Sequence, residues 1–141
     1  MIKIKKNLYQ GDLDDLDLTT LRISGIQGVI VVAEELYNVI PQKIEWNDND
    51  NTFIWKYNIR DDNSNQEDEI VNILDDIESS ILGKNKTLVL CSAGISRSPY
   101  VIARYLNQVD GLTMGEAYEY LKKLNPAVDD RTPLMGEMIE L

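Results

Sequence analysis

Residues 87–106 read TLVLCSAGISRSPYVIARYL, in which an apolar run precedes a loop of small residues and a helical pattern. Thr87 to Leu90 is typical of a buried central strand. Pro99 suits the first turn of a helix, and apolar side chains follow it at helical spacing. These side chains are Val101, Ile102, Tyr105, Leu106 and Val109. The segment therefore predicts a strand, a tight loop and a helix in direct succession.

The predicted loop has the properties of an anion-binding site. Its backbone N–H groups and the positive end of the following helix can all point at one spot. Gly94 permits a tight turn or a positive φ, and Arg97 adds a planar fork for two phosphate oxygens. We expect the loop to bind a phosphate group through Ser92, Ala93, Gly94, Ile95, Ser96 and Arg97.

Cys91 lies at the end of the predicted strand, beneath the same loop. The field that attracts phosphate also favours a thiolate there. Taken alone, a cysteine after an apolar strand is usually a small buried hydrophobe, and an arginine near a helix start is usually solvated. A cysteine, five uncharged residues, an arginine and a serine at one strand-to-helix junction have few structural reasons to occur together. The pattern favours a nucleophile below its own phosphate site.

The rest of the chain predicts an α/β fold. Short β-type runs at Ile2 to Ile4, Val29 to Ala33 and Phe53 to Tyr57 alternate with helical patterns. The length of 141 residues favours a single domain over residues 1–141. We expect layers in which helices flank a central, mostly parallel sheet.

Three helices besides the one after the loop are expected. Ser64 and Glu67 have capping-box spacing for the first, which Gly83 should end. Thr113 and Glu116 have the same spacing for the second, which ends at Asn125-Pro126. The inward side chains are expected to be Ile70, Ile73, Leu74, Ile77 and Ile81, then Ala117, Leu121 and Leu124. A short last helix is expected from Thr132-Pro133, with Leu134, Met138 and Leu141 on one side.

Composition and charge narrow the partners. A net charge of −10 argues against nucleic acid or an anionic membrane as the main partner. The one cysteine excludes an internal disulfide, and no run of residues has the pattern of a signal peptide or a membrane span. We therefore expect a cytoplasmic protein. Residues 79–109 contain no Asp or Glu, which either keeps an anion site attractive or reflects burial alone.

The segment Leu88 to Pro99 resembles the signature of the dual-specificity protein phosphatases, within the cysteine-dependent protein tyrosine phosphatase superfamily. Asn7 to Gly11 and Gly25 to Ala33 resemble the first two strands of that family. Tyr57 to Asp61 resembles its acid-bearing segment, and Glu116 to Lys123 its helix after the active site. The resemblance covers nearly the whole chain in the family's order, and it implies a protein tyrosine phosphatase-like fold.

This resemblance also implies a mechanism and its residues. Cys91 would attack phosphorus and form a phosphocysteine, while Arg97 and the loop amides stabilise the equatorial oxygens. Ser98 would hydrogen-bond the sulfur and help it leave, and Asp61 would act as general acid and then base. No metal or organic cofactor is implied. The expected partners are phosphorylated proteins or peptides, and phosphate, sulfate or vanadate in the loop.

The chain departs from the family in three places. Leu90 stands where the family usually has a histidine that orders the loop and keeps the thiolate charged, and the chain contains no histidine. Arg131 falls where the family has an asparagine that braces the loop. Asp61 and Asp62 are adjacent, so the spacing leaves both open as the acid, with Asp61 preferred; both could also belong to a solvated turn.

Two other functions compete with protein phosphatase activity. A pseudophosphatase would bind phosphorylated partners without turnover, which Leu90 and Arg131 favour, but binding alone needs no thiol. An enzyme acting on a phosphoinositide or an RNA 5′ end is a further candidate. Such relatives tend to carry basic residues within the loop, whereas the five residues between Cys91 and Arg97 are uncharged.

Overall fold

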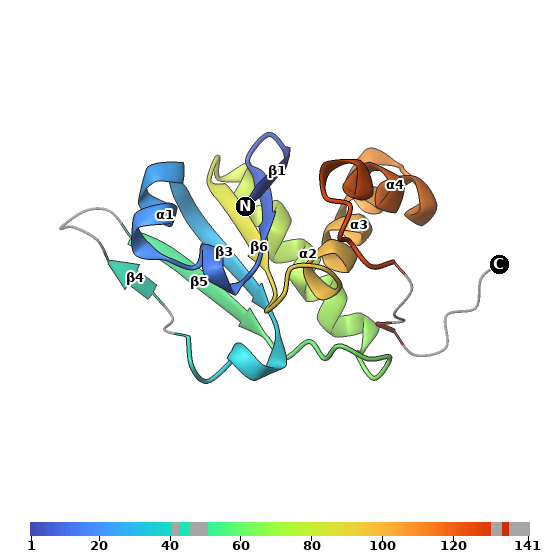
Figure 1. Ribbon diagram of the computed structural model, residues 1–141, viewed down its shortest axis with the longest axis horizontal. Helices are drawn as coiled ribbons and strands as arrows, with labels where there is room; N and C mark the ends of the chain where they lie inside the picture. The colour runs from blue at the N-terminus through green and yellow to red at the C-terminus, as the bar shows by residue number, and fades with distance from the viewer. Residues whose placement is uncertain (41–42, 46–50, 131–133, 136–141) are drawn as a thin grey trace.

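The computed structural model describes residues 1–40, 43–45, 51–130 and 134–135. They form an α/β domain with one central sheet (Figure 1). The elements in chain order are β1 (Ile2–Lys5), β2 (Leu8–Gly11), η1 (Leu13–Asp15), α1 (Leu18–Ser24), β3 (Ile26–Val32), η2 (Glu34–Leu36), β4 (Lys43–Glu45), β5 (Asn51–Tyr57), α2 (Glu67–Leu82), β6 (Lys86–Leu90), α3 (Arg97–Asp110) and α4 (Met114–Leu124).

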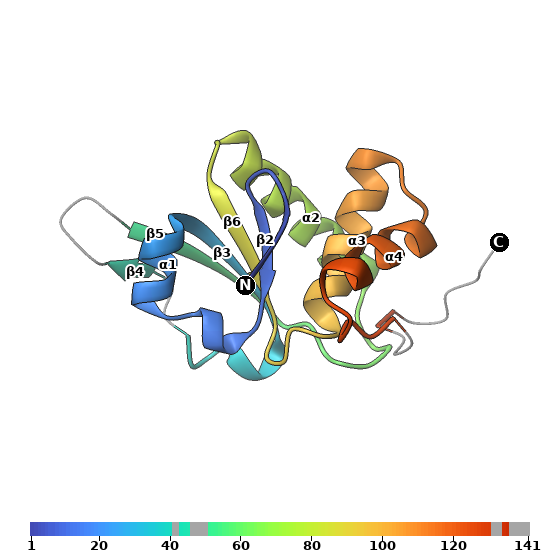
Figure 2. The same cartoon turned by 45° about the horizontal axis from the view of Figure 1, so that its top comes forward.

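The sheet has the strand order β1-β2-β6-β3-β5-β4. The four inner strands are parallel to one another, whereas β1 and β4 pair antiparallel at the two edges. The fan of strands is visible in Figure 2. The predicted mostly parallel sheet and its four β-type runs are thus confirmed, and β2 matches the first strand that the resemblance implies. The 3-10 turns, α1 and β4 were not expected.

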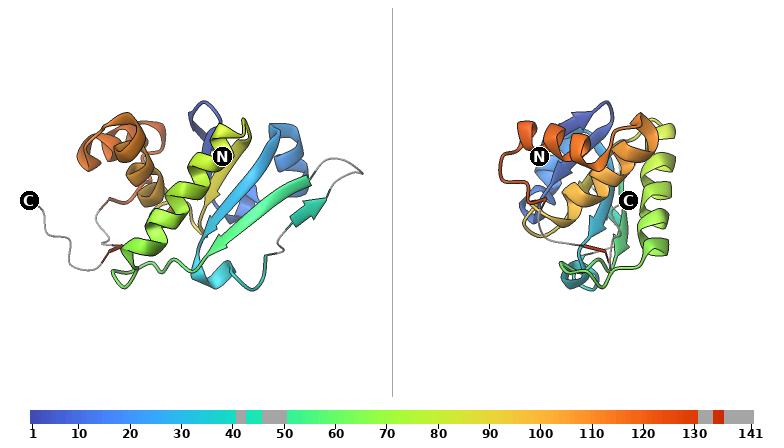
Figure 3. Two further views of the ribbon diagram at one scale, coloured as in Figure 1. Left: turned by 180° about the vertical axis from the view of Figure 1, so that it is seen from behind. Right: turned by 90° about the vertical axis from the view of Figure 1, so that its right-hand side faces the viewer.

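Helices cover both faces of the sheet, as Figure 3 shows from behind and from the side. α1 packs against β3 on one face, and α2 crosses the other face over β3 and β6. α3 lies beside α2 and contacts β2 and β6, while α4 packs on α3. Strands enclosed in this way read as continuous apolar runs, and every residue of β3 except Gln27 is buried.

The first long helix is present, but its predicted cap is wrong. α2 begins at Glu67 after Gln66, which forms no side-chain cap. The Ser64 hydroxyl instead donates to Asp62 at 2.5 Å, in the turn before the helix. Gly83 does end the helix, and its N–H donates to the carbonyls of Ser79 and Ile81. The inward face is confirmed for Ile70, Ile73, Leu74 and Ile77, with Ile81 partly buried.

The predictions for the other helices are confirmed in part. The capping box of Thr113 and Glu116 is confirmed at α4, as is its end at Asn125. Leu124 was expected to face inward, yet it is 38% exposed because it is the last residue of α4. The helix expected from Thr132-Pro133 lies outside the described residues, apart from buried Leu134 and Met135.

No helix in the described part of the chain has the length and apolar character needed to cross a membrane.

Candidate active site

The site lies where the parallel strands end. Parallel strands bring their carboxyl ends to one edge of a sheet, which is where α/β proteins commonly bind ligands. Gly11 of β2 and Val31 of β3 are both register partners of Leu90 in β6. Val32 likewise pairs with Tyr57 of β5. The segments that follow these four strands therefore meet, and they carry the cysteine loop, η1, η2 and the aspartate pair.

The cysteine loop joins β6 directly to α3, as the sequence predicts. Arg97 is the first residue of α3, and Ser96 is its N-cap without a side-chain cap bond. Within the described residues, no backbone N–H from Ser92 to Arg97 donates a hydrogen bond to the protein. Six amides at the start of a 14-residue helix thus remain available to an anion.

Carbonyl groups of the same loop are bound from outside. Leu13 N–H donates to the Ser92 carbonyl at 3.2 Å, and Asp129 N–H donates to the Ile95 carbonyl at 2.6 Å. The Gly94 carbonyl accepts from the side chain of Gln10 at 2.8 Å. Donors from two distant parts of the chain, residues 10–13 and Asp129, therefore bind the carbonyl groups of the loop. Its donors are left for a ligand.

Gly94 has the positive φ that the sequence suggested, at 72°. A Cβ atom at this position would lie 3.0 Å from the Gly11 carbonyl oxygen and 3.0 Å from the Asp12 Cβ. The loop therefore needs glycine for both its backbone conformation and its close approach to the end of β2.

Cys91 and Ser98 lie together at the base of the loop. The Cys91 side chain is buried, and its Sγ is 3.3 Å from the Ser98 Oγ. Ser98 is also fully buried, and its Oγ lies 3.4 Å from the Gly11 carbonyl. A serine hydroxyl at this distance can donate to a thiolate, which is the arrangement that the role predicted for Ser98 requires.

Arg97 is buried and paired with Glu35, a residue that the sequence analysis did not select. Its Nη1 donates to Glu35 Oε1 at 2.7 Å and to the Ile59 carbonyl at 3.0 Å, and Nη2 donates to Glu35 Oε2. The hydrogen bonds that Arg97 donates to Glu35 are the largest cause that raises the pKa of Arg97, and burial acts in the opposite direction. The charges of Glu35, Cys91 and Asp61 raise it further. The guanidinium is therefore held as a fixed cation beside the thiol.

The pairing leaves one edge of the guanidinium for a ligand. An arginine has five N–H groups, and Glu35 and Ile59 take three of them. The remaining N–H of Nη2 and the N–H of Nε lie side by side. Among the described residues neither has an acceptor. Two adjacent donors of this kind bind two oxygens of a phosphate group.

Glu35 is itself strongly acidic in this position. The hydrogen bond from Arg97 is the largest cause that lowers its pKa from 4.5 to about 2, and the Ser92 hydroxyl also donates to it. Burial acts in the opposite direction. The carboxylate therefore stays ionised and holds both Arg97 and the first residue of the loop.

The structure separates the two candidate acids. Asp61 Oδ1 accepts from the Ser96 hydroxyl at 2.9 Å, which places Asp61 against the loop. Asp62 is exposed and accepts from the backbone and hydroxyl of Ser64, within its own turn. Those bonds lower the pKa of Asp62. Of the adjacent pair, only Asp61 contacts the cysteine loop.

Glu35 and Gln10 are the site residues that the sequence analysis missed. Glu35 follows closely after the apolar run Val29 to Ala33, so it should have been expected at the same sheet edge as Cys91. Gln10 is a polar residue inside a strand, at a position that alternates inward with Leu8; its side chain is only 3% exposed. A buried amide in a strand is a usable signal, because buried polar groups almost always have partners.

Two expectations from the sequence remain, one on Arg131 and one on metal binding. Arg131 is not among the described residues. No group of three or more metal-binding side chains occurs within residues 1–40, 43–45, 51–130 and 134–135.

Comparisons with known proteins identify the family of the chain. The family model for the dual specificity phosphatase catalytic domain matches residues 8–141. Dual specificity protein phosphatase 9 of Homo sapiens is 26% identical over 151 residues, which cover 99% of this chain and 35% of the relative. The chain spans less than half the length of the curated relatives that it matches.

Solved structures establish the same fold. A human tyrosine phosphatase-like serine/threonine/tyrosine-interacting protein has a TM-score of 0.76 at 21% identity, covering 92% of this chain and 86% of that one. A mouse protein complexed with zinc tungstate has a TM-score of 0.74 at 17% identity, covering 92% and 78%.

A cysteine beneath a strand-to-helix loop, on a sheet of this order, defines the class of cysteine-dependent phosphatases. The chain belongs to the dual-specificity phosphatase family.

Proposed function

We propose that this chain hydrolyses phosphate esters of tyrosine, serine and threonine residues in proteins through a phosphocysteine intermediate. One observation carries the proposal. Buried Cys91 lies at the base of a loop whose amides have no acceptor in the described protein, next to an arginine with one unoccupied edge. An anion site built over a thiol has a ready use in phosphoryl transfer.

In the first step, the Cys91 thiolate attacks phosphorus as the bond from phosphorus to the substrate oxygen breaks. The loop amides and the free edge of Arg97 bind the phosphoryl oxygens, on which negative charge is spread. Asp61 gives its proton to the departing phenol or alkoxide. Its bond to Ser96 supports this assignment, because it keeps the carboxyl group beside the loop.

In the second step, water attacks the phosphorus of the phosphocysteine while Asp61 takes a proton from it. The sulfur–phosphorus bond breaks, and its electron pair stays on the Cys91 sulfur. The Ser98 hydroxyl, 3.3 Å away, donates to the thiolate as it forms. Inorganic phosphate then leaves the loop.

The same geometry supports binding of phosphate, sulfate or vanadate in the loop. The mouse protein of like fold is complexed with zinc tungstate, and tungstate is a tetrahedral oxyanion like phosphate. Phosphorylated proteins or peptides are the proposed partners.

A turnover assay on an aryl phosphate tests the proposal. The wild-type chain should release phosphate, and Cys91→Ser should abolish turnover while it keeps affinity for phosphate, since the loop amides and Arg97 are untouched. Acid-quenched mixtures should contain phosphate bound to Cys91, detectable by mass spectrometry. Turnover by Cys91→Ser at a comparable rate would refute the mechanism. Phosphate binding by the wild type without any turnover would instead indicate a binding module.

A further inference from the structure

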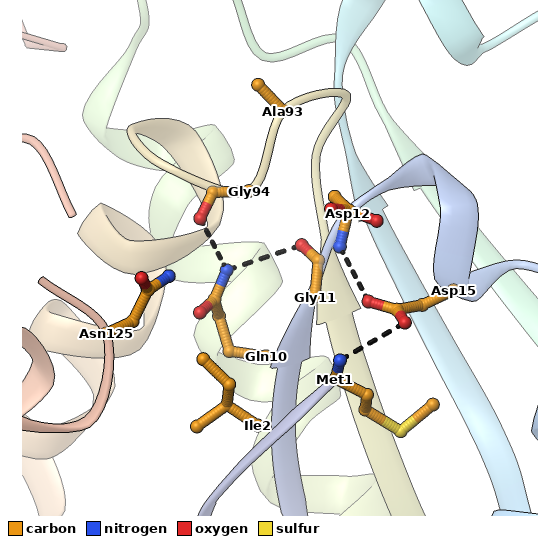
Figure 4. Close-up of a pocket in the computed structure, with 9 residues that line it drawn as sticks. All are labelled: Met1, Ile2, Gln10, Gly11, Asp12, Asp15, Ala93, Gly94 and Asn125. Carbon is orange, nitrogen blue, oxygen red and sulfur yellow. Dashed lines mark hydrogen bonds and ion pairs between the residues drawn. The ribbon is translucent and has the colours of Figure 1, made fainter. Parts of the chain in front are cut away.

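Gln10 places a buried amide behind the cysteine loop. Gln10 pairs with Val89 in the parallel register of β2 and β6, one position before the pair of Gly11 and Leu90. Figure 4 shows the carboxamide between the end of β2 and the loop, with Nε2 directed at the Gly94 carbonyl and the Gly11 carbonyl. Those distances are 2.8 Å to Gly94 and 3.3 Å to Gly11.

The same nitrogen reaches the residue that contacts the nucleophile. Gln10 Nε2 lies 3.1 Å from the Ser98 Oγ. Only the amide can be the donor toward the two carbonyls, which fixes the orientation of the Gln10 side chain. The amide has two hydrogens, and its two shortest contacts are to Gly94 and Ser98. The Ser98 oxygen therefore accepts a hydrogen bond from Gln10.

This bond determines where the Ser98 proton goes. A hydroxyl has a single hydrogen, and the amide of Gln10 fills an acceptor position on the oxygen. The hydrogen can then reach Cys91 Sγ at 3.3 Å or the Gly11 carbonyl at 3.4 Å. Once the sulfur is charged it is the better acceptor, because hydrogen bonds to ionised groups are the stronger ones. Gln10 thus orients Ser98 as a donor to the thiolate.

The residue next to the nucleophile cannot supply this support. Leu90 is fully buried and its side chain has no hydrogen-bonding group. Within the described residues, Ser98 is the side chain that hydrogen-bonds the Cys91 sulfur. The hydrogen bonds that link Gln10 to Ser98 and Ser98 to Cys91 are therefore the polar contacts that can stabilise a charged sulfur from the side of the sheet.

We propose that Gln10 is a positioning residue, which holds the Gly94 carbonyl away from the anion site and directs the Ser98 hydroxyl at the Cys91 sulfur. The inference rests on the proposed function for its kinetic part. Its main effect falls on the second step, in which the sulfur leaves phosphorus as a thiolate. Its effect on the free thiol exists whether or not the chain turns over a substrate.

Gln10→Met tests the proposal, because methionine keeps the length of the side chain and removes the amide. Gln27→Met is the matched control, since Gln27 is an exposed strand residue on β3. In Gln10→Met, we expect kcat on an aryl phosphate to fall by roughly three- to tenfold. This is the size expected when the hydrogen bond from Ser98 to the charged sulfur is weakened but not removed. The initial burst of phenol should grow, because hydrolysis of the phosphocysteine is slowed more than its formation.

Alkylation of Cys91 by iodoacetamide gives a readout that does not need phosphatase activity. The pH of half-maximal alkylation should move upward in Gln10→Met and stay at the wild-type value in Gln27→Met. If the proposed function fails, turnover is absent in the wild type but this upward shift remains. If the inference fails, the wild type turns over and Gln10→Met has the same burst and the same alkylation profile as the wild type.

A double variant separates positioning from general destabilisation. In the background of Ser98→Ala, replacing Gln10 by methionine should lower kcat by a smaller factor than it does in the wild type, because the hydroxyl that it orients is gone and only the bond to Gly94 remains to be lost. Full additivity of the two losses would overturn the proposal. Gln10→Leu provides a second substitution without an amide if Gln10→Met unfolds. Its side chain cannot donate a hydrogen bond, and it should show the same upward shift in alkylation.

Discussion

The substitution Gly94→Ala tests whether the close contact between the cysteine loop and the end of β2 is needed for stability and activity. The backbone φ of Gly94 is 72°, and the added Cβ would meet the Gly11 carbonyl oxygen at 3.0 Å and its carbon at 3.2 Å. Gly111 offers a matched control within the same fold. Its φ is 70°, and a Cβ there would meet nothing within 4 Å.

The two substitutions share one cost and differ in another. An L-residue in the left-handed region costs about 1–2 kcal/mol, which Gly111→Ala should show alone. At Gly94 the neighbour is backbone that cannot rotate away. Crowding in a packed site typically costs a further 1–3 kcal/mol. We therefore expect a loss of about 2–5 kcal/mol in the free energy of unfolding for Gly94→Ala.

Urea unfolding gives both values, and kinetics on an aryl phosphate gives the functional consequence. Gly111→Ala should keep the wild-type kcat/KM, because Gly111 ends α3 far along the chain from the loop. Gly94→Ala should lose activity even under conditions where it is folded, since the loop amides must shift to relieve the contact. Equal destabilisation by the two alanines, or wild-type kcat/KM in Gly94→Ala, would refute the reasoning.

Three other variants test the site. Asp61→Asn should lower kcat on a phosphotyrosine peptide by about 10²–10⁴-fold, and Asp62→Asn should change it little; the reverse result would move the acid by one residue. Arg97→Lys should weaken both phosphate binding and kcat, because an ammonium lacks the fork that holds Glu35 on one edge and phosphate on the other; wild-type values would contradict this. The pKa of Glu35 in the folded protein is about 2, below its ordinary value of 4.5. The ionised carboxylate therefore stabilises the fold fully above pH 4.5, and this contribution is lost as the pH falls toward 2. The stability difference between wild type and Glu35→Gln, from urea melts, should therefore shrink across that range, modestly because Glu35 is half exposed.

The strand-loop-helix unit was predictable because its information is local. Thr87 to Leu90, Gly94 and Pro99 each carry a conformational preference that does not depend on distant residues. The strand order was not local information, since β2 and β3 flank β6 from far earlier in the chain. The expected fold specified a central, mostly parallel sheet, and the order of its strands was not predicted.

The sequence did not reveal that the Ser64 hydroxyl has a competing partner, or which distant residues lie near the loop in space. Ser64 has a capping spacing, yet Asp62 is two residues away and takes its hydroxyl, so the helix starts later. The absence of acids from residues 79–109 left two interpretations open, an anion site kept attractive or burial alone. In space, Glu35 and Asp61 contact Arg97 and Ser96 directly. Charge along the sequence did not represent charge around the loop.

The parallel pairing of β2 with β6 gives the cysteine loop a late place in the order of folding. Roughly eighty residues separate Gln10 from its sheet partner Val89, and such non-local pairing is slow because the chain must first lose entropy. The backbone bond from Asp129 to Ile95 requires residues made later still. On the ribosome, Cys91 is therefore synthesised before its phosphate cradle can be completed. A nascent chain should therefore lack the completed cysteine loop until Asp129 and the strands on both sides of β6 have emerged.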